Sequence, residues 1–442
     1  MLDNIKKVHL IGIKGTGMSA LALALSSLGV EVSGSDAPDS FFLLDEKNFK
    51  EAGIIVYPQF SPDNLKDNID LVVASTSYGD TNIEIQEAKK RNLTVWQYPK
   101  MLGYLTKKFR SIAVCGSHGK TTTANLLAYT ARANGLPALA IGGPTSQQVL
   151  DLPLRQAGIP LNKEPELFIF EADEYQNKLQ YYHPHGVILT NIELDHPDFF
   201  KTDQEYAKVF SDFIERIPKD GFLIYCTDDE KAGTVASKAK CKTYGYGFSE
   251  HAEYKVSENS FPTSLLGRHN QLNATAVVLA ARLLGLNNDQ IKKSLSGFTG
   301  AHRRMQKVSE HPLIIDDYGH HPTEIKATLE ALREAYPDRT IWTVFHPHTF
   351  TRTQKFLKEF GQSFQNSDHT IVLDIYTSAR EQSGSVSAQD VVHEIQKNGR
   401  DAIYIPNIQQ VAKFLKDKLN DSTLLVTIGA GDVWKIHELI TK

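Results

Sequence analysis

Residues 111–125 read SIAVCGSHGKTTTAN, and this stretch gives the clearest indication of the fold class. The apolar run 112–115 predicts a buried strand, residues 116–119 predict a tight loop, and a helix is expected over 120–133. A strand, a glycine loop and a helix N-terminus together form a cradle for phosphate, because backbone N–H groups and the helix dipole face the anion. The stretch therefore predicts a nucleotide site on an α/β fold.

The residues of this loop and helix start are the first candidate site. They are Gly116, Ser117, His118, Gly119, Lys120, Thr121 and Thr122. Lys120 supplies a positive charge for phosphate, and the Thr121 hydroxyl is a suitable ligand for Mg²⁺. The spacing G-x-x-G-K-T-T is shorter than the common G-x-x-x-x-G-K-[ST], which would require glycine at Val114. A glycine-rich turn with an ordinary threonine cap remains the alternative.

Length and composition limit the classes of protein to consider. At 442 residues the chain is too long for one core, and about three domains are expected. The 48 basic and 52 acidic residues give a net charge of −4, so nothing suggests a nucleic-acid partner. Cys115, Cys226 and Cys241 lack metal-like spacing and read as reduced core thiols. Without a signal peptide or a long apolar run, we expect a cytoplasmic protein with no membrane segment.

The first third of the chain has a Rossmann-like pattern. A strand at 8–11, the loop GIKGTG at 12–17, a helix at 18–28 and a strand at 30–33 follow one another. The glycines fall as G-x-x-G-x-G rather than G-x-G-x-x-G, yet the loop still directs N–H groups at an anion such as a pyrophosphate. Asp36 is a candidate for ribose hydroxyls or for a helix cap, and Ser75 and Thr76 end another strand at 71–74.

In the middle third, two strands end in acidic clusters. The strand 167–170 runs into EADEY, and the strand 186–190 runs into NIELDHPD. Strand-end carboxylates hold Mg²⁺ in ATP sites and a histidine can share a second ion, which makes Glu171 and His196 candidates. Helix capping explains Asp173 and Asp198 equally well, but not Glu171, which directly follows an apolar strand and should be partly buried. Further on, Asn270 and Asn273 share one face of a helix, where their amides would read adenine or cap the helix.

The last third alternates strands and helices from residue 313 to residue 428, which predicts another doubly wound domain, with one helix at 351–364. Arg303 lies in a basic stretch before it and is suited to clamp phosphate, or it is simply solvated. Arg352 follows the strand 341–345 at a helix start, a position suited to bind a carboxylate; a solvated helix residue is the alternative.

These motifs carry a family resemblance. In order, G-x-x-G-K-T-T, E-A-D-E, T-N-I-E-x-D-H and G-R-H-N-x-x-N-A resemble the central domain of the Mur ligases. G-I-x-G-T-G-M-S-A at the front and D-D-Y-G-H-H-P-T-E, H-P-H-x-F-T-R-T and G-A-G-D near the end extend the resemblance over essentially the whole chain. It implies three doubly wound α/β domains: 1–108 for a UDP-substrate, 109–299 for ATP and 300–442 for an amino acid.

The resemblance also implies roles for individual residues. Lys120, Glu171 and His196 would be catalytic, and Thr121, Glu171 and His196 would hold magnesium. ATP would contact residues 116–122 together with Asn270, Asn273, Arg303 and Asp317. The UDP-substrate would contact Gly12, Lys14, Gly15, Thr16, Gly17, Met18, Asp36, Ser75 and Thr76. His348 and Arg352 would hold the carboxylate of the amino acid.

The implied reaction is an ATP-dependent ligation with Mg²⁺. L-alanine would be joined to the lactyl carboxylate of UDP-N-acetylmuramic acid through an acyl phosphate, in peptidoglycan synthesis, by a monomer or homodimer. Two alternatives remain open. The E-A-D-E-Y segment also occurs in the related ligase that recycles murein tripeptide. The other alternative is a non-catalytic nucleotide-binding protein or an NTPase switch on the same scaffold.

Overall fold

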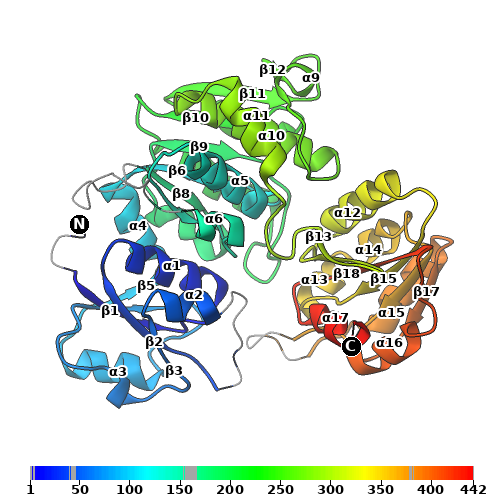
Figure 1. Ribbon diagram of the computed structural model, residues 1–442, viewed down its shortest axis with the longest axis horizontal. Helices are drawn as coiled ribbons and strands as arrows, with labels where there is room; N and C mark the ends of the chain where they lie inside the picture. Colours follow the sequence, from blue (N-terminus) through cyan, green and yellow to red (C-terminus); the bar gives the residue numbers. More distant parts are fainter. Residues whose placement is uncertain are drawn as a thin grey trace. The chain divides into compact units, whose positions relative to one another are not determined.

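The structure, a computed structural model, describes residues 2, 5–38, 40, 46–152, 154, 167–377, 381 and 383–441. These residues form three sheets, each flanked by helices, in an α/β fold (Figure 1). They divide into two compact units. The first holds residues 1–192, 207–262 and 272–299, and the second holds 193–206, 263–271 and 300–442. No helix among the described residues is long and apolar enough to cross a membrane.

The first sheet confirms the Rossmann-like pattern. Its strands are all parallel, in the order β3-β2-β1-β4-β5. They are β1 (Lys7–Ile11), β2 (Glu31–Ser35), β3 (Ile55–Tyr57), β4 (Leu71–Ala74) and β5 (Val95–Gln97), with helices α1 (Thr16–Ser27), α2 (Glu46–Glu51) and α3 (Ile83–Lys90). The strand order reverses between β1 and β4, which opens a ligand crevice at the carboxyl ends of these strands.

The second sheet is also fully parallel, in the order β12-β11-β10-β9-β6-β8-β7. Helix α4 (Tyr98–Lys108) leads into it from the first sheet. Its strands are β6 (Arg110–Cys115), β7 (Ala138–Ile141), β8 (Leu167–Glu171), β9 (Gly186–Leu189), β10 (Phe222–Cys226), β11 (Lys242–Gly247) and β12 (Tyr254–Lys255). The longer helices are α5 (Lys120–Ala133), α7 (Asp203–Ile214), α8 (Glu230–Ala236), α10 (Arg268–Leu283) and α11 (Asn288–Gly297). Helix α5 has the bounds that the sequence predicted.

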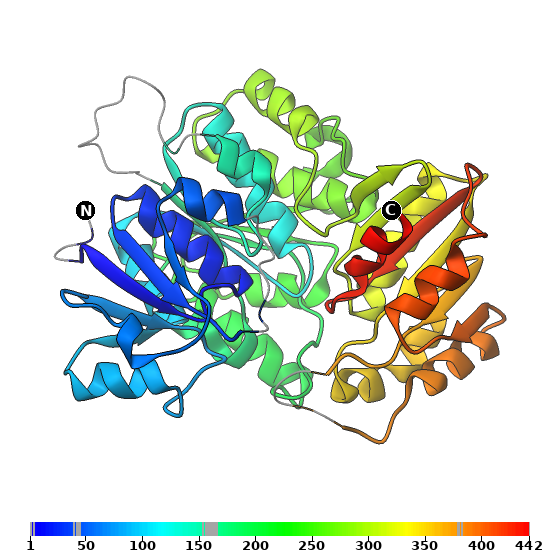
Figure 2. The same ribbon diagram turned by 60° about the horizontal axis from the view of Figure 1, so that its bottom comes forward.

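The third sheet lies in the second unit, in the order β13-β14-β18-β15-β16-β17. Its strands are β13 (Gln306–Glu310), β14 (Leu313–Asp317), β15 (Thr340–Phe345), β16 (His369–Val372), β17 (Asp401–Tyr404) and β18 (Thr423–Ile428); only β13 pairs antiparallel. Figures 1 and 2 show helices on both faces of this sheet. They are α12 (Pro322–Ala335), α13 (Phe350–Lys355), α14 (Leu357–Ser363), α15 (Ala388–Lys397), α16 (Ile408–Leu415) and α17 (Ile436–Ile440).

One predicted helix of this unit is wrong. The expected helix at 351–364 is interrupted at Phe356, whose φ of −110° and ψ of 23° leave the helical region, so that α13 and α14 are separate. The Phe356 ring is 9% exposed and packs against the His321 ring with their centroids 4.7 Å apart. The helix breaks where this ring is buried, and the periodicity of the sequence does not predict such a break.

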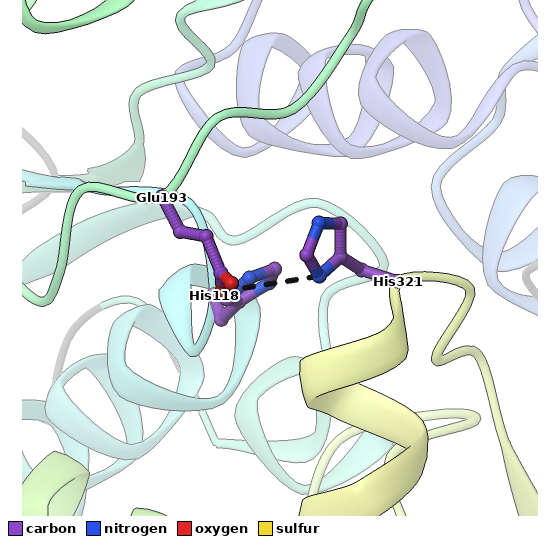
Figure 3. A group of neighbouring side chains, drawn as sticks. All are labelled: His118, Glu193 and His321. Carbon is purple, nitrogen blue, oxygen red and sulfur yellow. Dashed lines mark ion pairs between the residues drawn. The ribbon is translucent and has the colours of Figure 1, made fainter. Parts of the chain in front are cut away.

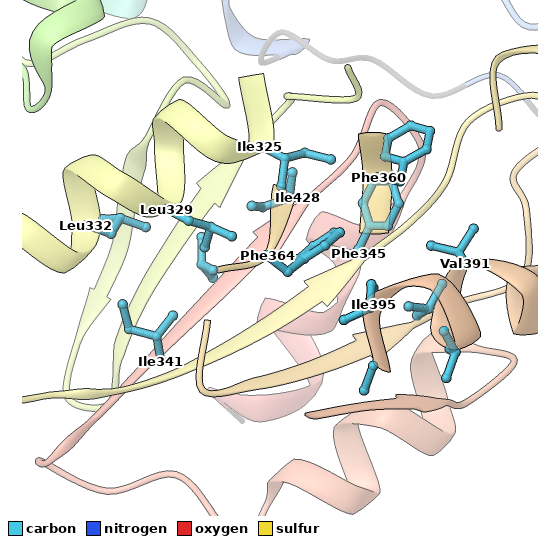
Figure 4. Packing of buried hydrophobic residues seen from close by; sticks show 14 of the residues in the cluster. Ile325, Leu329, Leu332, Ile341, Phe345, Phe360, Phe364, Val391, Ile395 and Ile428 are labelled. Atoms are coloured by element: carbon cyan, nitrogen blue, oxygen red, sulfur yellow. The ribbon is translucent and has the colours of Figure 1, made fainter. Parts of the chain in front are cut away.

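The core of the third sheet follows from the two-residue period of its strands. Leu313 and Ile315 of β14 join a cluster on one face, whereas Ile314 between them joins a cluster on the other. Figure 4 shows side chains of α12, α14 and α15 over the first of these faces. Two covered faces explain why the strands read as continuous apolar runs.

Candidate active site

The phosphate loop follows β6 in the first unit, and two of its residues must be glycine. Gly116 has a φ of +128°, and a Cβ atom there would lie 2.2 Å from Thr190 Oγ1. Gly119 has a φ of +83°, and a Cβ atom there would lie 2.6 Å from Asn273 Oδ1. Side chains would therefore both strain the backbone and fill the cradle, which confirms the predicted tight loop.

Asn191 fixes this loop from the end of β9. The Ser117 amide donates to the Asn191 carbonyl oxygen at 3.0 Å, and the His118 amide donates to Asn191 Oδ1 at 2.9 Å. The Thr190 hydroxyl donates to the His118 carbonyl oxygen at 2.7 Å. Amides in the first turn of α5, including those of Lys120 and Thr121, have no partner within the helix and are available to an anion.

Lys120 lies in a nearly buried position beside this loop. Its ammonium group donates to the carbonyl oxygens of Gly116 at 2.6 Å and Ser117 at 3.0 Å, and to Glu174 Oε2 at 2.9 Å. Burial alone would lower the pKa of Lys120, but the Glu174 carboxylate, followed by Glu171 and Asp173, raises it above its ordinary value. Lys120 is therefore held as a cation, as phosphate binding requires.

Glu171 lies beside the start of α5. The Thr121 hydroxyl donates to Glu171 Oε2 at 2.7 Å, and a Cβ atom on Gly143 would lie 2.5 Å from the same oxygen. Glu171 is partly buried, as the sequence predicts for a residue directly after an apolar strand. A hydroxyl and a carboxylate next to each other form an oxygen donor set that fits Mg²⁺.

The loop after β1 is held by Asp36. Its Oδ2 accepts a hydrogen bond from the Lys14 amide at 2.7 Å, while its Oδ1 accepts from the Ala37 amide, the Ser40 hydroxyl and the Tyr78 hydroxyl. Burial, together with the Asp36 charge, raises the pKa of Tyr78 to about 12. These bonds fasten the glycine loop rather than cap a helix, and contact with ribose stays a prediction.

The other residues predicted for the UDP-substrate lie at the same edge of the first sheet. Gly12 has a φ of +83°, and a Cβ atom there would lie 2.7 Å from the Tyr78 ring. Gly15 precedes the first turn of α1, which contains Thr16, Gly17 and Met18. Ser75 directly follows β4, and its amide donates to the Ile11 carbonyl oxygen at 2.9 Å; Thr76 comes next. The structure thus places the predicted set at the ends of β1, β2 and β4.

The second unit holds three predicted ATP contacts. Arg303, 2% exposed, donates from Nε to Asp316 Oδ2 at 2.7 Å and from its other nitrogens to the carbonyl oxygens of Gly429 and Gly431. Asp317 accepts from the Met305 and Gly319 amides, both at 2.7 Å, and burial raises its pKa to about 6. Asn270, inside the first turn of α10 (Arg268–Leu283), donates to the Leu266 carbonyl oxygen at 2.8 Å.

Arg352 and His348, the residues predicted for the amino acid, contact each other. Arg352 Nη1 lies 3.2 Å from His348 Nδ1. Arg352 also donates to Asp195 Oδ1, from Nη2 at 2.8 Å and from Nε at 3.1 Å. Burial alone would raise the pKa of Asp195, but the Arg352 guanidinium and then His196 hold it well below its usual value. This is a buried ion pair between a loop and α13.

Histidines of the same cluster are kept neutral. Burial, and then the His320 and Arg352 charges, lowers the pKa of His348 to about 3. Burial, and then the Arg352 charge, lowers the pKa of His320 to about 3 as well. A neutral His348 whose Nδ1 accepts from Arg352 carries its proton on Nε2 and can donate it to a ligand.

The loop that carries Asp195 is also anchored at Glu193. Thr323 at the start of α12 donates through its hydroxyl to Glu193 Oε1 at 2.8 Å, and His321 Nδ1 lies 3.8 Å from Glu193 Oε2 (Figure 3). His196 follows with a φ of +54°, and its amide donates to Asp195 Oδ1 at 2.6 Å. Two carboxylates, Glu193 and Asp195, therefore fasten this loop to the rest of the second unit.

The structure thus groups the predicted site residues by unit. In the first unit Lys120, Thr121, Glu171 and Asn273 gather at the phosphate loop. His196, His348 and Arg352 gather around Asp195 in the second. Three supporting residues, Glu174, Asn191 and Asp195, had no assigned role in the sequence analysis. Each follows a buried strand in the sequence, but only the structure identifies its partner.

Comparison with known proteins assigns three segments of the chain to one family. Residues 7–110 match the model described as Mur ligase family, catalytic domain. Residues 114–281 match the Mur ligase middle domain, and residues 303–431 match the Mur ligase, glutamate ligase domain.

Individual relatives extend over the full length. The UDP-N-acetylmuramate–L-alanine ligase of Desulfitobacterium hafniense is 35% identical over 455 residues, covering 98% of both chains. Among solved structures, the UDP-N-acetylmuramate-alanine ligase MurC of Thermotoga maritima superposes with a TM-score of 0.78 at 22% identity, covering 98% of both chains. A murein peptide ligase of Psychrobacter arcticus superposes with a TM-score of 0.71 at 22% identity, over 99% of this chain and 98% of its own. The two structural likenesses support the three-domain α/β fold.

Proposed function

The chain belongs to the Mur ligase family, and we propose that it joins L-alanine to UDP-N-acetylmuramic acid at the expense of ATP. The full-length relative at 35% identity carries that activity in its name. The structural observation that carries the proposal is the phosphate loop, where Lys120 is held as a buried cation between the loop and Glu174.

In the proposed reaction the lactyl carboxylate attacks the γ-phosphorus of ATP, which gives an acyl phosphate and ADP. The amine of alanine then attacks the acyl carbon, loses a proton and expels phosphate as the amide forms. Both steps bring negative charges together, so positive charge and N–H donors must be in place beforehand. Lys120 and the first-turn amides of α5 supply them.

Thr121 and Glu171 fit a magnesium ion, because they present a hydroxyl and a carboxylate side by side in a cradle that glycines keep open. His196 is the third predicted ligand. The ion would neutralise charge on the phosphates when bound. The Thr121 hydroxyl donates a hydrogen bond to Glu171, and this bond fixes the carboxylate at the end of β8.

We assign the remaining roles by segment. Residues 1–108 would bind the UDP-substrate with the glycine loop that Asp36 fastens. Residues 109–299 would bind ATP at the phosphate loop, with Asn273 against Gly119. Residues 300–442 would bind the amino-acid carboxylate at Arg352 and His348, where a guanidinium and a neutral imidazole donate from one cluster. Asn270, Arg303 and Asp317 are the proposed further contacts to ATP.

The test is phosphate release from ATP and Mg²⁺ with UDP-N-acetylmuramic acid, using L-alanine, L-serine, glycine and murein tripeptide as acceptors. The mass of each product is measured. Release with L-alanine and an amide product of matching mass supports the proposal. Turnover restricted to tripeptide would instead assign the chain to the recycling ligases. ATP turnover without any amide would favour an NTPase switch on the same scaffold.

A further inference from the structure

Asp195 occupies one edge of the Arg352 guanidinium. Both Nε and Nη2 donate to the same oxygen, Asp195 Oδ1, at 3.1 and 2.8 Å. The two side chains are 5% and 8% exposed. This edge of Arg352 is therefore closed to any second carboxylate.

The opposite edge of Arg352 keeps donors. A guanidinium has more N–H groups than these contacts and the Nη1 contact with His348 use. The three contacts use one N–H each on Nε, Nη2 and Nη1, which leaves one N–H on Nη1 and one on Nη2. Donors on these two neighbouring nitrogens suit the two oxygens of a carboxylate.

We propose that Asp195 is a positioning residue of the amino-acid site: it holds the Nε edge of Arg352 so that the far edge faces the carboxylate of the incoming amino acid. The inference rests on the proposed function. An arginine side chain has many rotamers, and fixing one before the ligand arrives removes an entropic cost from binding.

The surroundings explain why a fixed support is needed. Arg352 lies on α13, a helix of 6 residues that follows Thr349, whose φ is +64°. Such a short helix does not orient a long side chain by itself. The loop with Asp195 is in turn held by the Glu193 contacts to Thr323 and His321. Arg352 is thus braced from a segment 157 residues earlier in the chain.

The experiment compares Michaelis constants of the full chain. Asp195→Asn keeps the shape and one oxygen acceptor, and Asp195→Ala removes the acceptor. We expect the KM for L-alanine to rise by about 10-fold in the first and about 100-fold in the second, the range typical of residues that support a ligand-binding group. The KM values for ATP and UDP-N-acetylmuramic acid should stay near those of the wild type. Asp417→Asn, at an exposed carboxylate elsewhere in the same unit, is the control.

A double-mutant cycle shows whether the effect passes through Arg352. In an Arg352→Gln background, Asp195→Asn should raise the KM for L-alanine no further. Equal increases in both backgrounds overturn the proposal. So does an unchanged KM with a reduced kcat or a raised Mg²⁺ requirement, because Asp195 would then act through His196. If wild type ligates no alanine, the proposed function itself fails.

Discussion

The two units each contain a buried cation paired with a carboxylate, and the pairs are built differently. Lys120 lies 2.9 Å from Glu174 Oε2, and Arg352 lies 2.8 Å from Asp195 Oδ1. Lys120 and Glu174 follow β6 and β8, which are neighbours in one parallel sheet. Asp195 lies instead in a loop beyond β9, and Arg352 lies on α13. Sheet geometry brings the first pair together, whereas only the tertiary fold brings the second together.

The pairs also differ in the donors that they leave for a ligand. The Lys120 ammonium group already donates to Gly116, Ser117 and Glu174, so binding of a phosphate requires an exchange of partners. Arg352 keeps N–H groups on the edge away from Asp195. We therefore expect the first site to rearrange when its ligand binds and the second to be preorganised.

The largest expected effect is at the first pair. Lys120→Ala removes the buried positive charge of the phosphate loop and should lower kcat for ligation by about 10³-fold or more. Phosphate release under saturating substrates measures it, and circular dichroism reports whether the fold is retained. Lys89→Ala, at an exposed lysine paired with Asp80, is the control. Normal turnover in the Lys120 variant would remove the phosphate loop from the mechanism.

Loss of the second pair should change KM rather than kcat. Arg352→Ala removes the proposed carboxylate ligand and should raise the KM for L-alanine by about 100-fold, the cost of a charged hydrogen-bonded pair. The KM for ATP should change little. Steady-state kinetics with each substrate varied in turn measures both, and Arg400→Ala, which loses a bond to Gln365, is the control. Equal increases in both KM values would argue against carboxylate binding at Arg352.

The first pair belongs to a part of the structure that could be predicted from the sequence, because its residues lie in local motifs. Residues 116–122 and Glu171 could be predicted as site residues because their spacing and their position after buried strands are typical of a phosphate cradle. Helix α5 begins and ends at the predicted residues. The doubly wound α/β organisation of the last third followed from its alternation of strands and helices. All of these signals are local in the chain.

The sequence did not predict what depends on distant contacts. Asn191 supports Ser117 and His118 from 73 or more residues away, and Asp195 pairs with Arg352 across 157 residues. The break between α13 and α14 accompanies burial of Phe356 against His321. Short strands such as β3 and β12 have too few residues to show a period. Each of these features requires knowledge of the neighbouring element.

A smaller effect is expected at Gly119, where glycine avoids both backbone strain and a contact with Asn273. Gly119→Ala meets both a φ of +83° and a contact of 2.6 Å with Asn273 Oδ1. We expect a loss of about 1–3 kcal/mol in stability and about a 10-fold rise in the KM for ATP. Gly399→Ala has a φ of +75° with no atom within 4 Å of the added Cβ, so it measures backbone strain alone. Equal effects on the KM for ATP would show that the contact with Asn273 is unimportant.

The smallest expected effect concerns acid stability of the second unit. Burial lowers the pKa of His269 to about 4 and that of His346 to about 4, so the folded unit excludes protons that the unfolded chain binds. Stability from such a group is complete above its unfolded pKa near 6.5 and is lost as pH falls towards the folded value. The lowered pKa of His269 alone should reduce the free energy of unfolding of this unit by about 1 kcal/mol between pH 8 and pH 6.

His269→Gln cannot titrate and should flatten that loss, while His311→Gln, at a side chain 77% exposed, should not. Hydrogen exchange of peptides from β14 and β18 against pH reports the second unit separately from the first. The raised pKa of Asp317, about 6, acts in the opposite direction, because protonation of this buried carboxyl favours the folded state as pH falls. Six histidines of this unit, His269, His302, His320, His346, His348 and His437, have pKa values that burial lowers, against this one carboxyl. The net result should therefore be acid destabilisation of the unit that contains Arg352. An unchanged pH profile in His269→Gln would place the acid sensitivity at other groups.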